Sequence, residues 1–245
     1  MHSLRVAAVI RTFAVVLLVG VAACGPHENP QGGRPAGSSA TPAATDRVAA
    51  TASAKNDDAP RIVVLGDSLT AGLGLPQEEA YPALLQERLN QEGLNYRVVS
   101  AGVSGDTSAG GLSRLDWALD GNVRVLIVAL GGNDGLRGLP VEGLQQNLSR
   151  IIERAQARGI SVVLAGMEAP PNYGRQYIVA FHKVYPALAR TYHVPLVPFL
   201  LQGVAGDARL NQPDGIHPTA EGAQIVADNV WAVLKPIVEE HGSND

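Results

Sequence analysis

A serine stands directly after an apolar run, in a position where its hydroxyl could act as a nucleophile. Ser68 lies in Gly66–Leu69, which follows the aliphatic segment Ile62–Leu65. Such a run ending in glycine predicts a buried strand that stops in a tight turn. At the carboxyl end of a strand, a serine can present its hydroxyl to a substrate and its backbone N–H to an oxyanion. The alternative is a serine that only caps the helix that follows.

A histidine and an aspartate near the other end of the chain could activate this serine. Both lie in Asp214-Gly215-Ile216-His217-Pro218. Histidine suits a general base because its unperturbed pKa of about 6.5 is close to neutral pH. Asp214 could accept a hydrogen bond from His217 Nδ1, which would leave Nε2 free to take the proton of Ser68. The alternative for an isolated Asp-x-x-His is a surface cap or a satisfied polar turn.

Two glycine-containing loops could stabilise a negative charge on a reacting oxygen. In Ala101–Ser108, Gly105 has no Cβ, so its backbone N–H could approach a reacting carbonyl closely. In Gly131–Asp134, the side-chain amide of Asn133 could donate a hydrogen bond to an oxyanion. The alternatives are a cap for the next helix in the first loop and a simple turn residue in the second.

These residues need a scaffold that brings four distant loops together, and the hydrophobic pattern predicts one. Apolar strand candidates alternate with helical stretches, which implies a parallel sheet with helices on both faces. The strands are expected at Arg61–Leu65, Arg97–Ser100, Val123–Leu130, Ile160–Ala165 and Val194–Val197. The helices are expected near Glu78–Gln91, Ala109–Leu119, Val141–Arg158, Arg175–Tyr192 and Thr219–Val238.

The expected fold is α/β, a three-layer, doubly wound parallel sheet of five strands in the flavodoxin-like order 2-1-3-4-5. In that order the first strand lies between the second and the third. The loops Gly66–Thr70, Gly102–Ser108 and Gly131–Gly135 would then converge on one crevice. The loop after the fourth strand, Glu168–Gly174, is expected to form the rim of an apolar pocket, with Pro170, Pro171 and Tyr173 shaping its entrance.

The order of these blocks resembles the GDSL, or SGNH, hydrolases from about Arg61 to Val238. The blocks are Gly-Asp-Ser-Leu after the first strand, a glycine after the second, Gly-Gly-Asn-Asp after the third and Asp-x-x-His-Pro before the last helix. Within the family the chain looks most like the bacterial acyl-CoA thioesterase, lysophospholipase and arylesterase group. Supporting segments are Ser104–Ser108, Leu130–Gly138 and Pro171–Gly174.

The resemblance implies a role for each matching residue. Ser68 would be the nucleophile, His217 the base and Asp214 its orienting partner. The backbone N–H groups of Ser68 and Gly105 and the Asn133 amide would form the oxyanion hole. The implied reaction is hydrolysis of esters or thioesters through an acyl-serine, with no metal and no organic cofactor. The alternatives are an acyltransferase or carbohydrate deacetylase on the same fold and a non-catalytic, lipid-anchored binding module.

Composition limits the partners. The net charge is -4 with no basic block, which argues against nucleic acid. The single cysteine, Cys24, excludes a disulfide framework or cysteine metal site within one chain. We expect a monomer that acts on a small acyl ester or lipid substrate.

The N-terminal region is typical of a bacterial lipoprotein. A charged start, the short apolar segment Phe13–Gly20 and Val21-Ala22-Ala23-Cys24 predict a signal peptide over 1–23 and lipidation of Cys24. Residues 24–60 are rich in Gly, Pro, Ala, Ser and Thr and predict a disordered tether with a reach of about 30–35 Å. Residues 61–240 would be the hydrolase domain. It would lie on the periplasmic side of the envelope, anchored by lipid to the outer membrane.

Overall fold

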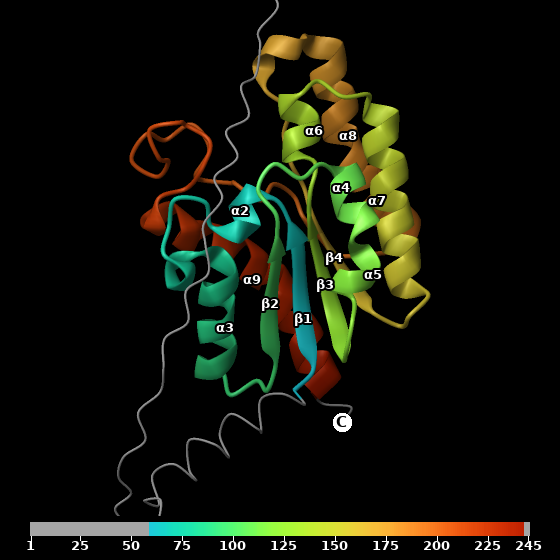
Figure 1. Ribbon diagram of the computed structural model, residues 1–245, viewed down its shortest axis with the longest axis vertical. Coiled ribbons are helices and arrows are strands. Elements are labelled where there is room, and N and C mark those ends of the chain that lie inside the picture. The colour runs from blue at the N-terminus through green and yellow to red at the C-terminus, as the bar shows by residue number, and fades with distance from the viewer. Residues whose placement is uncertain (1–58, 243–245) are drawn as a thin grey trace, which may run out of the picture. The chain divides into compact units, whose positions relative to one another are not determined.

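A parallel sheet is the framework of residues 59–242, the part of the chain that the structure, a computed structural model, describes (Figure 1). Its strand order is β2-β1-β3-β4-β5, and every neighbouring pair is parallel. The strands are β1 (Arg61–Gly66), β2 (Arg97–Gly102), β3 (Val123–Ala129), β4 (Ser161–Ala165) and β5 (Leu196–Val197). The predicted fold class and the predicted order 2-1-3-4-5 are confirmed.

The inner strands are apolar along their whole length because helices cover both faces of the sheet. In β1 only Arg61 is not buried, and in β3 only Arg124 is exposed. The edge strand β2 is more polar, with Arg97 and Ser100 exposed. Register pairs Gly66 of β1 with Gly102 of β2 and with Ala129 of β3, so the three strands end side by side.

Helices form a layer on each side of the sheet (Figure 1). One layer contains α3 (Tyr81–Gln91) and α9 (Ala220–Gly242), which pack on each other. The other contains α4 (Ser108–Ser113), α5 (Leu115–Ala118), α7 (Val141–Gln156) and α8 (Arg175–Tyr192). Short elements at the strand ends are α2 (Ser68–Ala71), η1 (Gln77–Glu79), α6 (Gly132–Leu136) and η2 (Pro171–Tyr173). Within residues 59–242 no helix combines the length and apolar character that crossing a membrane requires.

Three predicted elements differ from the structure in informative ways. The helix expected over Ala109–Leu119 is two helices, α4 and α5, separated by the non-helical Arg114. The helix expected from Glu78 begins at Tyr81 with Pro82 in its first turn, where a missing N–H is tolerated. Strand β5 begins only at Leu196, since Pro195 has no N–H to donate to a strand partner.

Candidate active site

Ser68 is the first residue of α2, immediately beyond the end of β1. Asp67 is the residue that caps this helix, because its Oδ1 accepts a hydrogen bond from the backbone N–H of Leu69 at 3.0 Å. The alternative that Ser68 serves as the cap is therefore wrong. The hydroxyl of Ser68 is left available for other contacts, and its backbone N–H has no partner within the helix.

The structure brings Ser68, His217 and Asp214 together in a continuous chain of hydrogen bonds. Ser68 Oγ lies 2.8 Å from His217 Nε2, and His217 Nδ1 lies 2.6 Å from Asp214 Oδ2. The Asp214 carboxylate also accepts the backbone N–H groups of Ile216 and His217 at 2.9 and 3.0 Å. These hydrogen bonds, that of Ile216 foremost, lower the pKa of Asp214 to about 2.

The charge on Asp214 fixes the direction of the hydrogen bonds when His217 is neutral. An ionised carboxylate can only accept, so Nδ1 carries the imidazole proton and donates it to Asp214. Nε2 is then an acceptor, and the partner at 2.8 Å is the hydroxyl of Ser68. The arrangement is that of a serine poised to lose its proton to a neutral imidazole.

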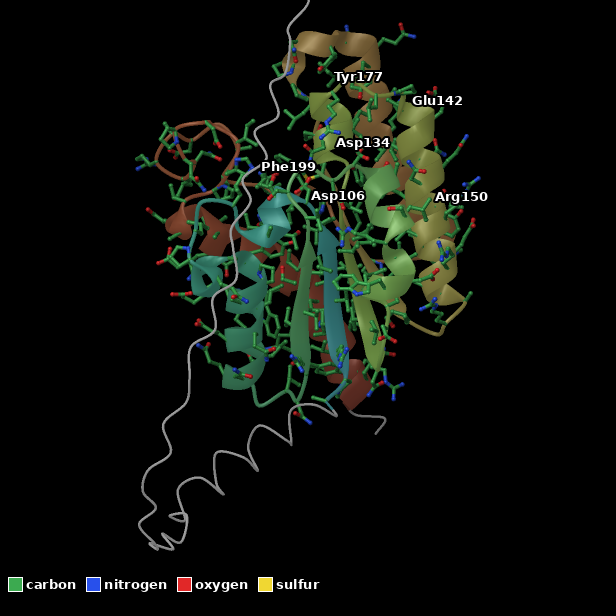
Figure 2. The ribbon with its side chains drawn as sticks, viewed as in Figure 1. Asp106, Asp134, Glu142, Arg150, Tyr177 and Phe199 are labelled. Carbon is green, nitrogen blue, oxygen red and sulfur yellow. The ribbon has the colours of Figure 1, made fainter. Side chains whose placement is uncertain are left out.

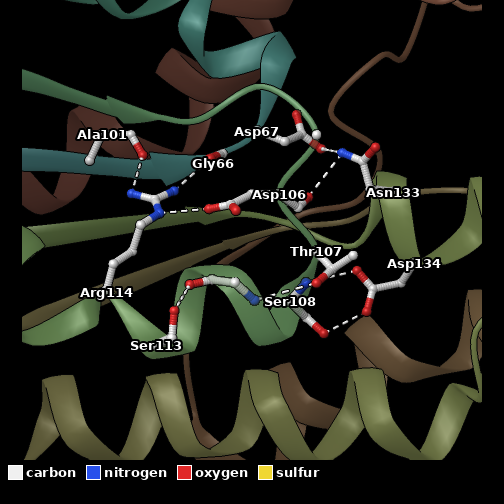
Figure 3. Close-up of polar contacts among 12 residues, drawn as sticks. Gly66, Asp67, Ala101, Asp106, Thr107, Ser108, Ser113, Arg114, Asn133 and Asp134 are labelled. Carbon is white, nitrogen blue, oxygen red and sulfur yellow. Dashed lines mark hydrogen bonds and ion pairs between the residues drawn. The ribbon is translucent and has the colours of Figure 1, made fainter. Parts of the chain in front are cut away.

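Asn133 joins two of the loops that meet at Ser68 (Figure 3). It lies in the first turn of α6, so it is not merely a turn residue. Its Nδ2 donates to the Asp106 carbonyl at 2.9 Å and to Asp67 Oδ2 at 3.2 Å. Burial raises the pKa of Asp67 to about 6. The hydrogen bonds from Leu69 and Asn133 lower this pKa, but their effect is smaller than that of burial.

Gly105 lies in the loop between β2 and α4, outside any helix or strand. Its φ of 84° is a conformation that glycine adopts without strain, and its carbonyl accepts a hydrogen bond from Arg137 Nη2 at 2.7 Å. The helix that follows is capped by Thr107, whose side chain accepts from Gly110 N. Gly105 therefore has its own fixed position in the loop, separate from the cap.

Arg114 is a residue that the sequence reasoning missed. At the break between α4 and α5, its guanidinium donates to the carbonyls of Gly66 and Ala101 at 2.8 Å each, and Nε donates to Asp106 Oδ2 at 2.6 Å (Figure 3). One side chain therefore ties the ends of β1 and β2 to the loop that carries Gly105. Nothing in the spacing of the sequence pairs Arg114 with these partners.

A second missed contact fixes α4 against α6. The carboxylate of the buried Asp134 accepts the backbone N–H of Ser108 at 2.7 Å and its hydroxyl at 2.6 Å (Figure 3). Asn147 of α7 donates to the same hydroxyl at 3.0 Å. Ser108 and Asp134 both belong to loops that the sequence singles out, but no sequence signal joins them.

A groove with a volume of about 350 Å³ opens at Ser68 and His217. Most of its lining is apolar, and the side chains come from several loops: Leu69, Leu136, Met167, Ala169, Pro170, Pro171, Phe199, Leu201, Ala205 and Ile216. Phe199 and Asp106 both lie at the end of the sheet toward which the strands point (Figure 2). Pro170 and Pro171 line the groove, as predicted. Tyr173 is not among the lining residues, and its hydroxyl instead donates to the Leu136 carbonyl at 2.7 Å.

Cys24 and the predicted signal and tether lie outside the described residues, apart from the last two tether positions. Four loops supply the candidate catalytic residues: those after β1, β2 and β3, and the segment before α9. The segments after β4 and β5 add apolar lining to the groove.

Comparisons with known proteins agree with this fold. The model of the GDSL-like Lipase/Acylhydrolase family matches residues 64–225. Esterase TesA of Pseudomonas aeruginosa is 48% identical over 178 residues, which is 72% of this chain and 89% of that protein. Thioesterase 1/protease 1/lysophospholipase L1 of Escherichia coli strain K12 is 39% identical over 178 residues, 72% of this chain and 84% of that protein.

A solved structure gives the same picture in three dimensions. The crystal structure of AlinE4, an SGNH-hydrolase family esterase, superposes with a TM-score of 0.62 at 47% identity, covering 73% of this chain and 96% of that one. The family match over residues 64–225 includes the loops that carry Ser68, Asn133 and His217. The chain belongs to the GDSL-like lipase/acylhydrolase family.

Proposed function

We propose that the protein hydrolyses acyl esters and acyl thioesters through a covalent acyl-Ser68 intermediate. The single observation that carries this proposal is the hydrogen-bonded chain from Ser68 Oγ to His217 and on to Asp214 at the mouth of an apolar groove. A serine with an adjacent, oriented base is the arrangement that acyl transfer requires.

In the proposed reaction, Ser68 Oγ attacks the acyl carbonyl while His217 Nε2 takes the hydroxyl proton. Collapse of the tetrahedral intermediate breaks the bond to the alcohol or thiol, which leaves with the proton from His217. A water molecule then gives its proton to His217, attacks the acyl-serine and releases the acid, which restores Ser68. The negative charge of Asp214 stabilises the imidazolium formed in each half of the cycle.

The proposed oxyanion hole consists of the backbone N–H groups of Ser68 and Gly105 and the Asn133 amide. In the structure, Asn133 Nδ2 already contacts Asp67 and the Asp106 carbonyl, and the contact with Asp67 is the longer one at 3.2 Å. We infer that the oxyanion takes over the N–H that points to Asp67. Loss of one such donor typically lowers the rate by about 10²–10³.

The apolar groove supports an acyl chain as the part of the substrate that is bound. Its volume of about 350 Å³ falls at the lower end of the usual range for small-molecule sites. Aryl esters, lysophospholipids and acyl thioesters all combine such a chain with a cleavable carbonyl. The names esterase and thioesterase/lysophospholipase, borne by the relatives above, support the same substrate classes.

The proposal extends to where the protein acts. The apolar segment Phe13–Gly20 and the lipobox-like Val21–Cys24 support export and lipidation at Cys24. We place the hydrolase domain on the periplasmic side of the envelope, as a monomer held at the outer membrane by this anchor. Residues 25–60, with their Gly, Pro, Ala, Ser and Thr content, would give it reach.

The test is hydrolysis of p-nitrophenyl esters from acetate to palmitate by the wild type, Ser68→Ala and His217→Ala. We expect Ser68→Ala to lose essentially all activity, and the preferred chain length to report the length of the groove. Acyl thioesters are assayed in parallel with a thiol reagent. A folded Ser68→Ala variant that keeps wild-type turnover would refute the mechanism. Transfer of the acyl group to added glycerol in place of water would identify an acyltransferase.

A further inference from the structure

Large hydrophobic side chains are exposed around the mouth of the groove. Four of them form what we call the apolar rim: Leu73, Val103, Leu136 and Ile216, which are 47%, 43%, 42% and 40% exposed. Each stands on a segment that also carries a residue of the proposed catalytic machinery. Soluble proteins scatter such side chains singly, so a group at one opening indicates a surface that is covered by a partner.

Hydrogen bonds and groove contacts connect the rim residues to one another through the site. The Leu73 carbonyl accepts a hydrogen bond from Gln212 Nε2 at 2.7 Å, which places it beside the loop of Ile216. Val103 N donates to the Gly66 carbonyl at 3.1 Å, at the end of β1. Leu136 and Ile216 line the groove itself. Leu73 lines a much smaller hollow that also touches Ser68 and His217, and Val103 lines neither. The rim therefore continues the apolar lining outward onto the surface.

We propose that the apolar rim docks on a lipid surface and admits acyl chains from it directly into the groove. The proposal rests on the function proposed above. Because Leu136 and Ile216 line the groove that opens at Ser68, a protein partner or a second copy seated on the rim would cover that opening and block hydrolysis. A lipid layer is different, because it contains the substrate. The shared residues Leu136 and Ile216 let a chain pass from lipid to groove without crossing water.

Charged groups of both signs at the mouth favour a zwitterionic layer over an anionic one. The acidic groups are Asp214, whose side chain is 44% exposed, and Glu168, which lines the groove and pairs with His182. The basic group is Arg137, which follows Leu136 and donates a hydrogen bond to the Gly105 carbonyl. The predicted lipid attachment at Cys24 supports the same occupant, because it would keep the domain within a tether length of a membrane. The tether would leave the domain free to rotate, and the rim would then set its orientation relative to the membrane.

The test uses the full chain with Cys24→Ser in every sample, so that a lipid anchor contributes nothing. The rim variant is Leu73→Ser with Val103→Ser, which leaves the lining of the 350 Å³ groove intact. Val103→Ser alone, which alters neither that groove nor the smaller hollow beside Ser68, is tested next to it. The matched control is Trp117→Ser, since Trp117 is 74% exposed on α5, alongside the strands and away from the rim (Figure 1). Substrates are soluble p-nitrophenyl acetate and p-nitrophenyl palmitate carried in phosphatidylcholine vesicles. Binding is measured by co-flotation with the same vesicles in the Ser68→Ala background.

We expect the rim variant to lose about tenfold in vesicle binding and in hydrolysis of the vesicle-borne ester, with hydrolysis of the soluble ester unchanged. Trp117→Ser should match the wild type in all three measurements. Wild-type vesicle binding by the rim variant, or an equal loss in Trp117→Ser, would overturn the proposal. An equal loss on both esters would instead assign the rim to substrate binding. A wild-type dimer that the rim variant dissolves would assign it to a second copy.

Failure of the underlying function would look different. Ser68→Ala would then hydrolyse both esters at the wild-type rate, whatever the rim variant did. The rim variants retain Ser68, His217 and Asp214, so their result reports the docking surface and not the chemistry.

Discussion

Arg114 holds the backbone that carries two of the proposed oxyanion donors. Its three hydrogen bonds reach the Gly66 carbonyl just before Asp67 and Ser68, the Ala101 carbonyl, and the carboxylate of Asp106, the neighbour of Gly105. The ion pair with Asp106 is largely shielded from solvent, with side-chain exposures of 17% and 19%. We assign Arg114 as a positioning residue, which acts through Ser68 and Gly105 and does not touch the substrate.

Replacing Arg114 should therefore lower kcat with little change in KM. We expect Arg114→Met to lose about 10²-fold in kcat, comparable with loss of one oxyanion donor. Arg114→Lys should recover part of the loss, because an ammonium can satisfy some of the three acceptors. The matched control is Arg150→Met on the outer side of α7 (Figure 2), which should leave kcat unchanged. A rise in KM alone, measured on p-nitrophenyl acetate, would contradict the positioning role.

Asp67 gives the fold a specific dependence on pH. With its pKa raised to about 6 by burial, Asp67 binds a proton more tightly in the folded state than in the unfolded one. The contribution of this group to the free energy of unfolding therefore decreases as pH rises from about 4 to about 6, by roughly 3 kcal/mol. Asp67→Asn can still cap α2 and lacks the titration. The free energy of unfolding, measured with urea at pH 4.5 and pH 7, should decrease more between the two pH values in the wild type than in the variant. Parallel profiles would contradict this account of Asp67.

At the scale of elements, α2 can sit where it does because β2 ends in glycine. A Cβ on Gly102 would lie 2.3 Å from Ala71 N and 2.7 Å from Thr70 C, both backbone atoms of α2. The sheet therefore has to approach the helix that begins with Ser68 more closely than any side chain allows. Hydrogen bonds from Ser100 Oγ to the Thr70 carbonyl, and between Thr70 Oγ1 and Tyr81, fix the same helix.

Gly102→Ala should displace α2 and with it Ser68. We expect a loss of about 1–3 kcal/mol in the free energy of unfolding and a decrease in kcat. Gly143→Ala in the first turn of α7 is the control, since beyond the backbone of its own helix nothing lies within 4 Å of the new Cβ. It should stabilise by up to about 1 kcal/mol and leave kcat unchanged. Thermal melts measure the stability of both variants, and kinetics on one ester measure their kcat. Equal effects of the two substitutions would show that the close contact between Gly102 and α2 is not required.

The sequence allowed prediction of the elements whose signal is local. Strand β1 and its turn follow from the run Ile62–Leu65 and Gly66, and α8 over Arg175–Tyr192 follows from its helical period. The break at Arg114 was not predicted, because the side chain there is held by acceptors 13 and 48 residues away. Helical periodicity carries no information about such partners. The hydrogen bond between Asn133 and Asp67, which are 66 residues apart, could not be predicted for the same reason.

At the scale of the whole molecule, we predict that the enzyme is attached to a membrane at Cys24. Cys24→Ser should move the protein from the membrane fraction to the soluble fraction of the expressing cells, because the acyl chains that anchor it are absent. Ser68→Ala, which leaves Cys24 intact, is the control and should stay with the membranes. Fractionation followed by immunoblotting measures both. Equal membrane recovery of Cys24→Ser and the wild type would show that Cys24 is not the anchor.

Covalent labelling of Ser68 is the most direct test of the acyl-serine mechanism. A fluorophosphonate carrying an alkyl chain should react at Ser68 Oγ with loss of fluoride, and mass spectrometry should find one adduct per chain on the peptide containing Ser68. Hydrolysis of p-nitrophenyl esters should fall in proportion to labelling, and His217→Ala should label far more slowly than the wild type. An adduct on another residue, or full ester hydrolysis by a chain fully labelled at Ser68, would contradict the acyl-serine mechanism.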